Sequence, residues 1–150
     1  MTLTDNLQVA STASGARAFA RSKRTILVAE DSSDSREMLQ VLLELKGYAV
    51  VSAADGYDAV QLAVREVPDL ILMDLQLPEL DGLSVAKELR LHSQLQAVPI
   101  IIISGNDPAK FRTKALSAGC DDYLLKPIDF ERLDQILRER IPAAVRARHA

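Results

Sequence analysis

Two hydrophobic patterns alternate along the chain from about residue 25 onward. Short, mostly apolar runs, such as those at 69–73 and 99–103, are followed by longer stretches in which apolar residues recur every three or four positions. The short runs are typical of buried strands, and the longer stretches are typical of amphipathic helices. Because the alternation occurs five times, the sequence predicts five strand–helix units joined by short connections.

The spacing within the helical stretches also predicts which side chains face the core. Glycine and proline mark helix ends at Gly47, Gly119 and Pro142. In the first helix an inward face is predicted for Met38, Leu39, Leu42 and Leu45, and in the second for Ala59, Leu62 and Ala63.

The strand pattern predicts a fold class. The apolar runs are continuous and do not alternate with polar residues, which indicates a parallel sheet covered on both faces. Right-handed crossovers then place helices on both sides of that sheet. The expected fold is therefore α/β and doubly wound, and sites in such folds lie at the carboxyl ends of the strands.

Composition narrows the class of protein. The chain of 150 residues is 48% hydrophobic and suits one globular domain, expected at 24–141. Residues 1–23, rich in Ala, Ser and Thr, are expected to form a flexible arm, and 142–150 a short tail. A net charge of −3 argues against nucleic-acid binding, and no apolar run approaches the ~20 residues that a membrane span needs. The single cysteine, Cys120, excludes an internal disulfide and is typical of a cytoplasmic protein.

Polar residues stand where four of the predicted strands end. Glu30 and Asp31 follow the first strand, Asp74 follows the third, Ser104 ends the fourth and Lys126 follows the fifth. Taken singly, these are ordinary caps, turn residues or surface charges. Because the carboxyl ends of parallel strands share one edge, we expect all of them to converge there.

The chemistry of this group indicates phosphoryl transfer. Clustered carboxylates repel one another and favour a cation, and oxygen ligands with open water positions suit Mg²⁺. Beside a metal and Lys126, Asp74 stays ionised and can attack a phosphoryl group to form an acyl phosphate. The Ser104 hydroxyl can then donate a hydrogen bond to a phosphate oxygen.

The segments "LVAEDS", "ILMDLQLPELDG", "IIISG" and "YLLKPID" resemble the receiver domain of two-component response regulators. The resemblance implies a flavodoxin-like (βα)5 fold with strand order 2-1-3-4-5. It also implies that Asp74 accepts a phosphoryl group from a sensor histidine kinase or a histidine phosphotransfer protein. The implied Mg²⁺ ligands are Glu30, Asp31, Asp74 and the backbone carbonyl of Gln76, with Lys126 contacting the phosphoryl group.

The resemblance further implies a conformational switch. Ser104 and Tyr123 occupy the switch positions, and Tyr123 is expected to turn from exposed to buried when Ser104 moves toward the phosphoryl group. The altered face would then recruit a downstream protein target. The peptide bond between Lys126 and Pro127 is expected to be cis.

Three alternatives accompany this interpretation. After Pro142 only "AAVRARHA" follows, which favours a single-domain response regulator, although a receiver domain from a hybrid histidine kinase or a larger regulator would look the same. A haloacid-dehalogenase-like phosphatase needs a second aspartate two residues after the nucleophile, where this chain has Gln76. A degenerate receiver used as a scaffold is disfavoured by the complete set of site residues. We therefore expect no enzyme activity beyond the protein's own phosphorylation and dephosphorylation.

A homodimer through the fourth and fifth helices is a further expectation. Basic residues of the fourth helix would face nearby acids there, although mixed charges are also typical of a solvated surface. The residues concerned are Lys110, Arg112 and Lys114, with Asp121, Asp122 and Glu131.

Overall fold

The computed structural model describes residues 23–106 and 108–141. Most of the arm predicted at 1–23 and the tail predicted at 142–150 lie outside this range. Among the described residues, no helix has both the length and the apolar character needed to cross a membrane.

A parallel sheet of five strands forms the centre of the described region. Its strands are β2 (Thr25–Ala29), β3 (Ala49–Ala53), β4 (Leu70–Asp74), β5 (Ile100–Ser104) and β6 (Asp122–Leu125). They pair in the order β3-β2-β4-β5-β6, and every pair is parallel. Counted along the chain this is the order 2-1-3-4-5, so the predicted fold is confirmed.

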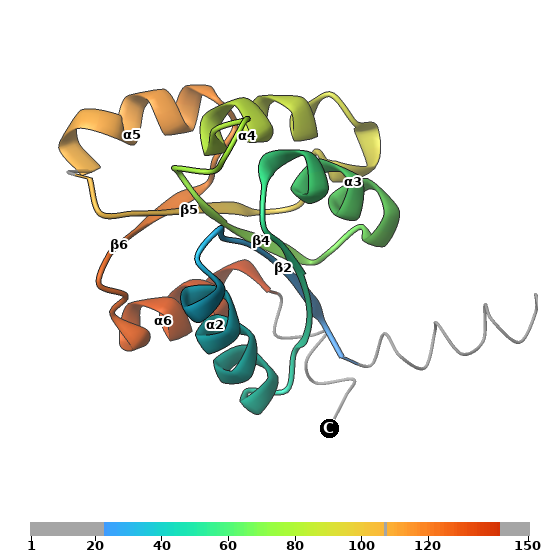
Figure 1. The fold of residues 1–150 in the computed structure, drawn as a ribbon, viewed down its shortest axis with the longest axis vertical. Helices are drawn as coiled ribbons and strands as arrows, with labels where there is room; N and C mark the ends of the chain where they lie inside the picture. The colour runs from blue at the N-terminus through green and yellow to red at the C-terminus, as the bar shows by residue number, and fades with distance from the viewer. Residues whose placement is uncertain (1–22, 107, 142–150) are drawn as a thin grey trace, which may run out of the picture.

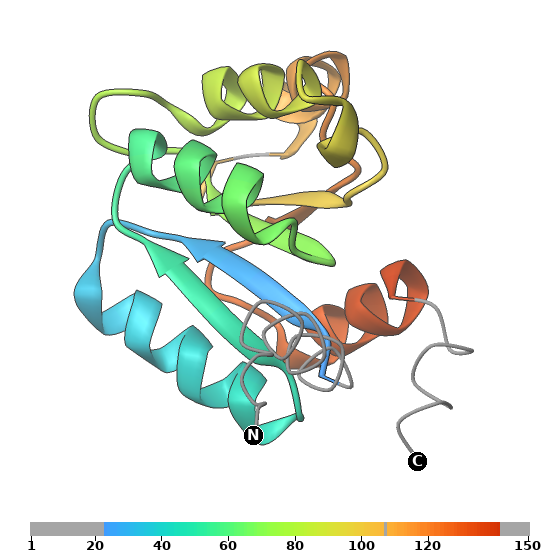
Figure 2. The ribbon, with the colours of Figure 1, turned by 90° about the vertical axis from the view of Figure 1, so that its right-hand side faces the viewer.

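Helices cover both faces of the sheet, in agreement with the prediction. They are α2 (Ser33–Leu45), α3 (Gly56–Glu66), α4 (Gly82–Arg90), α5 (Pro108–Ser117) and α6 (Phe130–Arg140), with a short 3₁₀ turn at Ser93–Leu95. Helices α3, α4 and α5 lie on one face, and α2 and α6 lie on the other (Figure 1). The view turned by 90° shows the sheet between these two layers (Figure 2).

The sheet separates two hydrophobic cores. In β2, Leu27 and Ala29 enter the core beneath α3, α4 and α5, whereas Ile26 and Val28 enter the core above α2 and α6. Each of these four side chains is buried. Burial on both faces is therefore the reason that the strand reads as a continuous apolar run.

The inward face predicted for the first helix is partly wrong. Met38 and Leu45 are 45% and 81% exposed, and the residues of α2 that are buried are Leu39 and Leu43, with Leu42 packed partly against them. Because α2 meets the sheet along a stripe of four-residue spacing, Leu45 lies about 200° around the helix from Leu43. In α3, Ala59 and Ala63 are buried and Leu62 packs against the same core, as predicted.

Side-chain caps start the helices at the edge of the sheet where the strands end. Ser32, Asp55, Asp81 and Asp129 each accept a hydrogen bond from a backbone N–H in the first turn of the following helix. Three of these caps, Ser32, Asp55 and Asp129, stand only two to four residues after the preceding strand. Residues just beyond the strand ends are thus held close to the sheet.

Candidate functional site

The predicted polar residues do converge at the carboxyl edge of the sheet. Asp74 and Ser104 are the last residues of β4 and β5, Glu30 and Asp31 follow β2, and Lys126 follows β6. Strand β4 is the central strand, so Asp74 stands between the ends of β2 and β5. The topology therefore brings together residues that are up to 96 positions apart in the sequence.

Lys126 joins two of the carboxylates directly. Its Nζ donates hydrogen bonds to Oδ2 of Asp74 at 2.9 Å and to Oε1 of Glu30 at 3.3 Å. The side chains of Asp74 and Glu30 are only 8% and 3% exposed, whereas that of Lys126 is 35% exposed. The ammonium group thus partly neutralises two buried acids from the solvent side, and the cis bond predicted between Lys126 and Pro127 is confirmed.

The acids form a set that suits a divalent cation. Glu30, Asp31 and Asp74 each offer a carboxylate oxygen within 4.8 Å of the others, and Asp31 is exposed. Carboxylate oxygens with access to water are the ligand type that Mg²⁺ takes in proteins. With three carboxylates against the single ammonium of Lys126, an excess of negative charge remains for a cation to neutralise.

The local environment shifts two pKa values. Burial raises the pKa of Glu30, and a hydrogen bond shared with Asp74 raises it further. Partial burial lowers the pKa of Lys126, but its hydrogen bond to Asp74 and the charges of Asp74 and Glu30 outweigh that effect and leave the pKa raised. Lys126 therefore remains a cation at neutral pH.

The loop after β4 fixes the position of Asp74. Oδ1 of Asp74 accepts a hydrogen bond from the backbone N–H of Gln76 at 2.9 Å. Gly82 donates to the carbonyl of Leu75 at 2.8 Å, and a Cβ at Gly82 would lie 2.6 Å from the carbonyl oxygen of Asp74. Only glycine allows this approach. The carbonyl of Gln76 lies in this loop, and its role as a metal ligand stays a prediction.

The two predicted switch residues are linked through one peptide segment. Oγ of the buried Ser104 accepts a hydrogen bond from the backbone N–H of Asn106 at 3.0 Å. The carbonyl of Asn106 in turn accepts one from the Tyr123 hydroxyl at 3.2 Å. Tyr123 is half-buried, and its expected turn from an exposed to a buried position stays a prediction.

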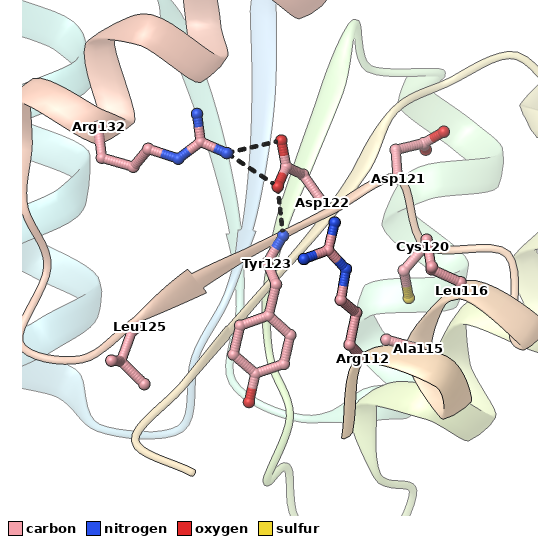
Figure 3. A pocket seen from close by; sticks show the side chains of 9 residues that line it. All are labelled: Arg112, Ala115, Leu116, Cys120, Asp121, Asp122, Tyr123, Leu125 and Arg132. Atoms are coloured by element: carbon pink, nitrogen blue, oxygen red, sulfur yellow. Dashed lines mark hydrogen bonds and ion pairs between the residues drawn. The ribbon is translucent and has the colours of Figure 1, made fainter. Parts of the chain in front are cut away.

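Beside Tyr123 lies a cavity of about 200 Å³ on the face formed by α5, β6 and α6. Figure 3 shows Tyr123 and Leu125 projecting from β6 on one side of it, and Arg112 and Leu116 belonging to α5 on the other. Leu116 and Leu125 are 54% and 45% exposed. Apolar and charged side chains thus share this face, a composition that protein partners often contact.

The charges assigned to a homodimer are partly satisfied within the chain. Asp121 pairs with Arg90 at 2.9 Å, and Asp122 pairs with Arg132 and Arg140 at 3.1 and 3.5 Å. These two acids are therefore less available to a second copy than the sequence indicated. The homodimer stays a prediction.

Sequence reasoning missed Arg36. Its Nη1 donates to the backbone carbonyls of Glu30 and Asp31. An arginine in a polar turn of a helix looks like any surface charge in the sequence. The only sign of this role in the sequence is that Arg36 follows Asp31 by five residues, about one helical turn after the start of the helix.

Comparison with known proteins identifies the type of domain. The family model described as "Response regulator receiver domain" matches residues 26–138. The chain is 40% identical over 116 residues to the probable transcriptional regulator ycf27 of Porphyridium aerugineum, covering 77% of this chain and 47% of that protein. It is 35% identical over 127 residues to the DNA-binding dual master transcriptional regulator RpaA of Synechocystis sp., covering 81% of this chain and 53% of that one.

The solved structures include a magnesium-bound example. The receiver domain of the sensor histidine kinase PA1611 from Pseudomonas aeruginosa, with magnesium coordinated in its active-site cleft, superposes with a TM-score of 0.74 at 39% identity. The match covers 79% of this chain and 98% of that domain.

The relatives also bear on the expectation that the protein has no nucleic-acid partner. The chain spans about half the length of the curated relatives it matches. One of these longer proteins is named as DNA-binding. The expectation of no nucleic-acid partner rested on the charge of these 150 residues alone, and it is not supported.

Proposed function

Because this chain belongs to the response regulator receiver domain family, we propose that it accepts a phosphoryl group on Asp74 and changes its protein-binding face in response. The observation that carries the proposal is the contact between Lys126 and Asp74 at 2.9 Å, at the edge of the Glu30–Asp31–Asp74 cluster. A nucleophilic carboxylate, a fixed ammonium and a cation-binding set of oxygens are the parts that phosphoryl transfer to an aspartate requires.

In the proposed step, a carboxylate oxygen of Asp74 attacks the phosphorus of a phosphohistidine on a sensor kinase or phosphotransfer protein. The new P–O bond replaces the P–N bond, and the released imidazole takes a proton from water. The ammonium of Lys126 passes from Asp74 to an oxygen of the bound phosphoryl group. The hydroxyl of Ser104 donates a hydrogen bond to another phosphoryl oxygen.

The residues proposed to hold Mg²⁺ are Asp31 and Asp74, with Glu30 directly or through water and the backbone carbonyl of Gln76. When bound, the ion would neutralise charge on the phosphoryl oxygens. Within the chain itself, Lys126 lowers the repulsion between Asp74 and Glu30.

The hydrogen bonds of Asn106 support a route for the switch. As Ser104 turns its hydroxyl toward a phosphoryl oxygen, the bond from the Asn106 N–H to Ser104 Oγ is lost, and the segment carrying the Asn106 carbonyl is free to move. The Tyr123 hydroxyl is bonded to that carbonyl, so its ring follows. Phosphorylation thereby changes the face around β6, where a downstream protein target binds.

The same acceptor chemistry serves a receiver that works alone, one joined to a DNA-binding domain, and one within a hybrid histidine kinase. Relatives of about twice this length are named as transcriptional regulators. The downstream target is therefore proposed only as a protein surface or a neighbouring domain that prefers the altered β6 face.

Labelling with a small phosphodonor tests the proposal. We expect acetyl phosphate with Mg²⁺ to add one phosphoryl group to each chain, detected by intact mass spectrometry. Asp74→Asn should remove the label, because the amide cannot form the acyl phosphate. Asp69→Asn is the matched control at the other end of β4 and should keep it. Persistent labelling of Asp74→Asn at another residue would sink the assignment.

The phosphatase alternative has a distinct signature. A haloacid-dehalogenase-like enzyme would release phosphate repeatedly from small phosphate esters. Two residues after Asp74 this chain presents the exposed amide of Gln76, which has no carboxyl to act as general acid or base. We expect at most slow phosphate release from the protein's own acyl phosphate. Sustained turnover of a phosphate ester that requires Asp74 would favour the enzyme.

A further inference from the structure

We propose that Arg36 is a positioning residue for the cation site, holding the backbone of Glu30 and Asp31 so that the Asp31 carboxylate faces the incoming Mg²⁺. The inference rests on the proposed function, because it concerns the same acidic cluster. It assigns a role to a side chain whose hydrogen bonds go to backbone carbonyls and not to a carboxylate of that cluster.

The contacts of Arg36 are with carbonyl oxygens. Its Nη1 donates to the carbonyl of Glu30 at 2.7 Å and to that of Asp31 at 3.4 Å. The side chain is half-buried and belongs to α2, the helix that follows the Glu30–Asp31 turn. One nitrogen therefore fixes the orientation of two successive peptide planes at the end of β2.

Asp31 depends on this support more than the other two acids do. Glu30 is held by Lys126 and by the backbone N–H of Ser32 at 3.2 Å, and Asp74 is held by Lys126 and the N–H of Gln76. The carboxylate of Asp31 accepts no hydrogen bond from any other residue within 23–106 and 108–141. Its backbone conformation is thus what keeps it within 4.8 Å of the other carboxylates.

Helix electrostatics do not explain an arginine at this position. The N-terminus of α2 carries the positive end of the helix dipole, where a cation is unfavourable. Ser32 and Asp34 already provide the cap and the acidic first-turn residue that stabilise this end. The carbonyl contacts supply a reason for Arg36 that the helix itself does not.

If Arg36 acted only through its charge, removing it would have the opposite effect on Mg²⁺ binding. A guanidinium near three carboxylates repels a divalent cation, so its removal would tighten binding. If Arg36 instead positions the Asp31 backbone, its removal weakens binding. Substituting residues that support metal ligands typically lowers metal affinity 10- to 100-fold, and the two roles therefore differ in sign.

A titration with Mg²⁺ alone separates these roles. Amide chemical shifts in two-dimensional NMR spectra would give the dissociation constant for the wild-type protein, Arg36→Lys and Arg36→Met. We expect Arg36→Met to bind Mg²⁺ about 10-fold more weakly, because it has no donor for either carbonyl. Arg36→Lys keeps one nitrogen that can donate to both carbonyls, so it should bind Mg²⁺ more tightly than Arg36→Met. Without metal, the amide order parameter of Asp31 should fall in Arg36→Met. Arg65→Met, at the exposed arginine of α3, should match the wild type in both measurements.

Unchanged or tighter Mg²⁺ binding in Arg36→Met would overturn the inference, as would binding in Arg36→Lys that is no tighter than in Arg36→Met. An unchanged order parameter at Asp31 would overturn it as well. If the wild-type protein itself bound no Mg²⁺, the proposed function would fail first. Asp31→Asn provides that reference, since it should lose Mg²⁺ binding while keeping Arg36 and its carbonyl contacts.

Discussion

The two edges of the sheet hold their charged residues in opposite ways. At the amino edge, Asp69 pairs with Arg24 and Asp121 pairs with Arg90, each through an arginine. Both acids also accept a backbone N–H, from Thr25 at 2.8 Å and from Ile100 at 2.9 Å. Each of these two acids thus has both an arginine and a backbone N–H as partners, which indicates a structural role.

At the carboxyl edge, the acids outnumber their partner. Glu30 and Asp74 share Lys126, and the third acid, Asp31, is left to solvent. Clustered like charges destabilise a folded chain unless a ligand neutralises them. The comparison indicates that the amino edge stabilises the fold and that the carboxyl edge keeps unsatisfied charge for binding and chemistry.

The largest expected effect is on chemistry at the carboxyl edge. Lys126→Met removes the ammonium that would neutralise the transferring phosphoryl group. We expect the rate of labelling by acetyl phosphate to fall on the order of 1,000-fold. This is comparable to the fall in rate when an enzyme loses one preorganised hydrogen-bond donor. The control is Lys46→Met, which breaks only the ion pair with Asp134. Labelling of Lys126→Met at the wild-type rate would contradict the comparison.

The next largest effect is on stability at the amino edge. Arg90 donates to the carbonyls of Leu95, Val98 and Gly119 and pairs with Asp121. Arg90→Met removes these hydrogen bonds and the ion pair, and it should lower the free energy of unfolding by about 3 kcal/mol, measured by urea denaturation.

At a temperature where Arg90→Met is folded, acetyl phosphate should still label its Asp74. If labelling were lost while folding was intact, the amino edge would not be purely structural. The exposed Arg65 is the matched control, and Arg65→Met should change stability by less than about 0.5 kcal/mol.

Positive φ angles at non-glycine residues occur near both edges of the sheet, at Val67 (43°) and at Glu79 (69°). In the loop after β4, Glu79 has a φ of 69° inside a tight turn where Leu80 N–H bonds the Pro78 carbonyl at 2.7 Å. Near the amino edge, the turn after α2 has glycine, Gly47, at a φ of 98°. Glu79→Gly should therefore raise the free energy of unfolding by about 1 kcal/mol, whereas Gly47→Ala should lower it by a similar amount.

Thermal melts of both variants would test this contrast. No gain in Glu79→Gly would mean that contacts of the glutamate side chain offset the strain. Gly47→Ala isolates the conformational cost, because a Cβ at Gly47 would meet nothing within 4 Å.

The smallest expected effect is a gain in stability at the carboxyl edge. Asp31→Asn removes repulsion from Glu30 and Asp74 without breaking a hydrogen bond to the described residues. In the presence of a chelator its melting temperature should rise by about 2 °C. Mg²⁺ should raise the melting temperature of the wild type and leave that of Asp31→Asn unchanged. Asp69→Asn should instead melt lower, because Asp69 bonds both Arg24 and Thr25.

The fold and the main site residues followed from short-range patterns. Continuous runs such as Ile100–Ser104 can be buried on both faces only in a covered parallel sheet. Once the sheet is parallel, the positions of Asp74 and Lys126 after their strands bring them to one edge. Topology alone therefore predicted a contact across 52 residues of sequence.

The rotation of a helix about its own axis and the contacts of long polar side chains could not be predicted in the same way. Apolar residues of α2 lie on several sides of the helix, so the residue types alone could not show whether Leu43 or Leu45 is buried. Arg36 and Arg90 act on backbone carbonyls, which leave no mark in a sequence. The orientation of Tyr123 depends on the Asn106 carbonyl for the same reason.

The place of β6 in the sheet has a consequence for the order of synthesis. Strand β6 is an edge strand that pairs only with β5, and it is the last strand of the described chain. Lys126 arrives with it, long after Glu30 and Asp31 have left the ribosome. A nascent or truncated chain without this strand has the acids but lacks the ammonium that contacts Asp74. Under the proposed function, such a chain should be labelled far more slowly than the complete domain.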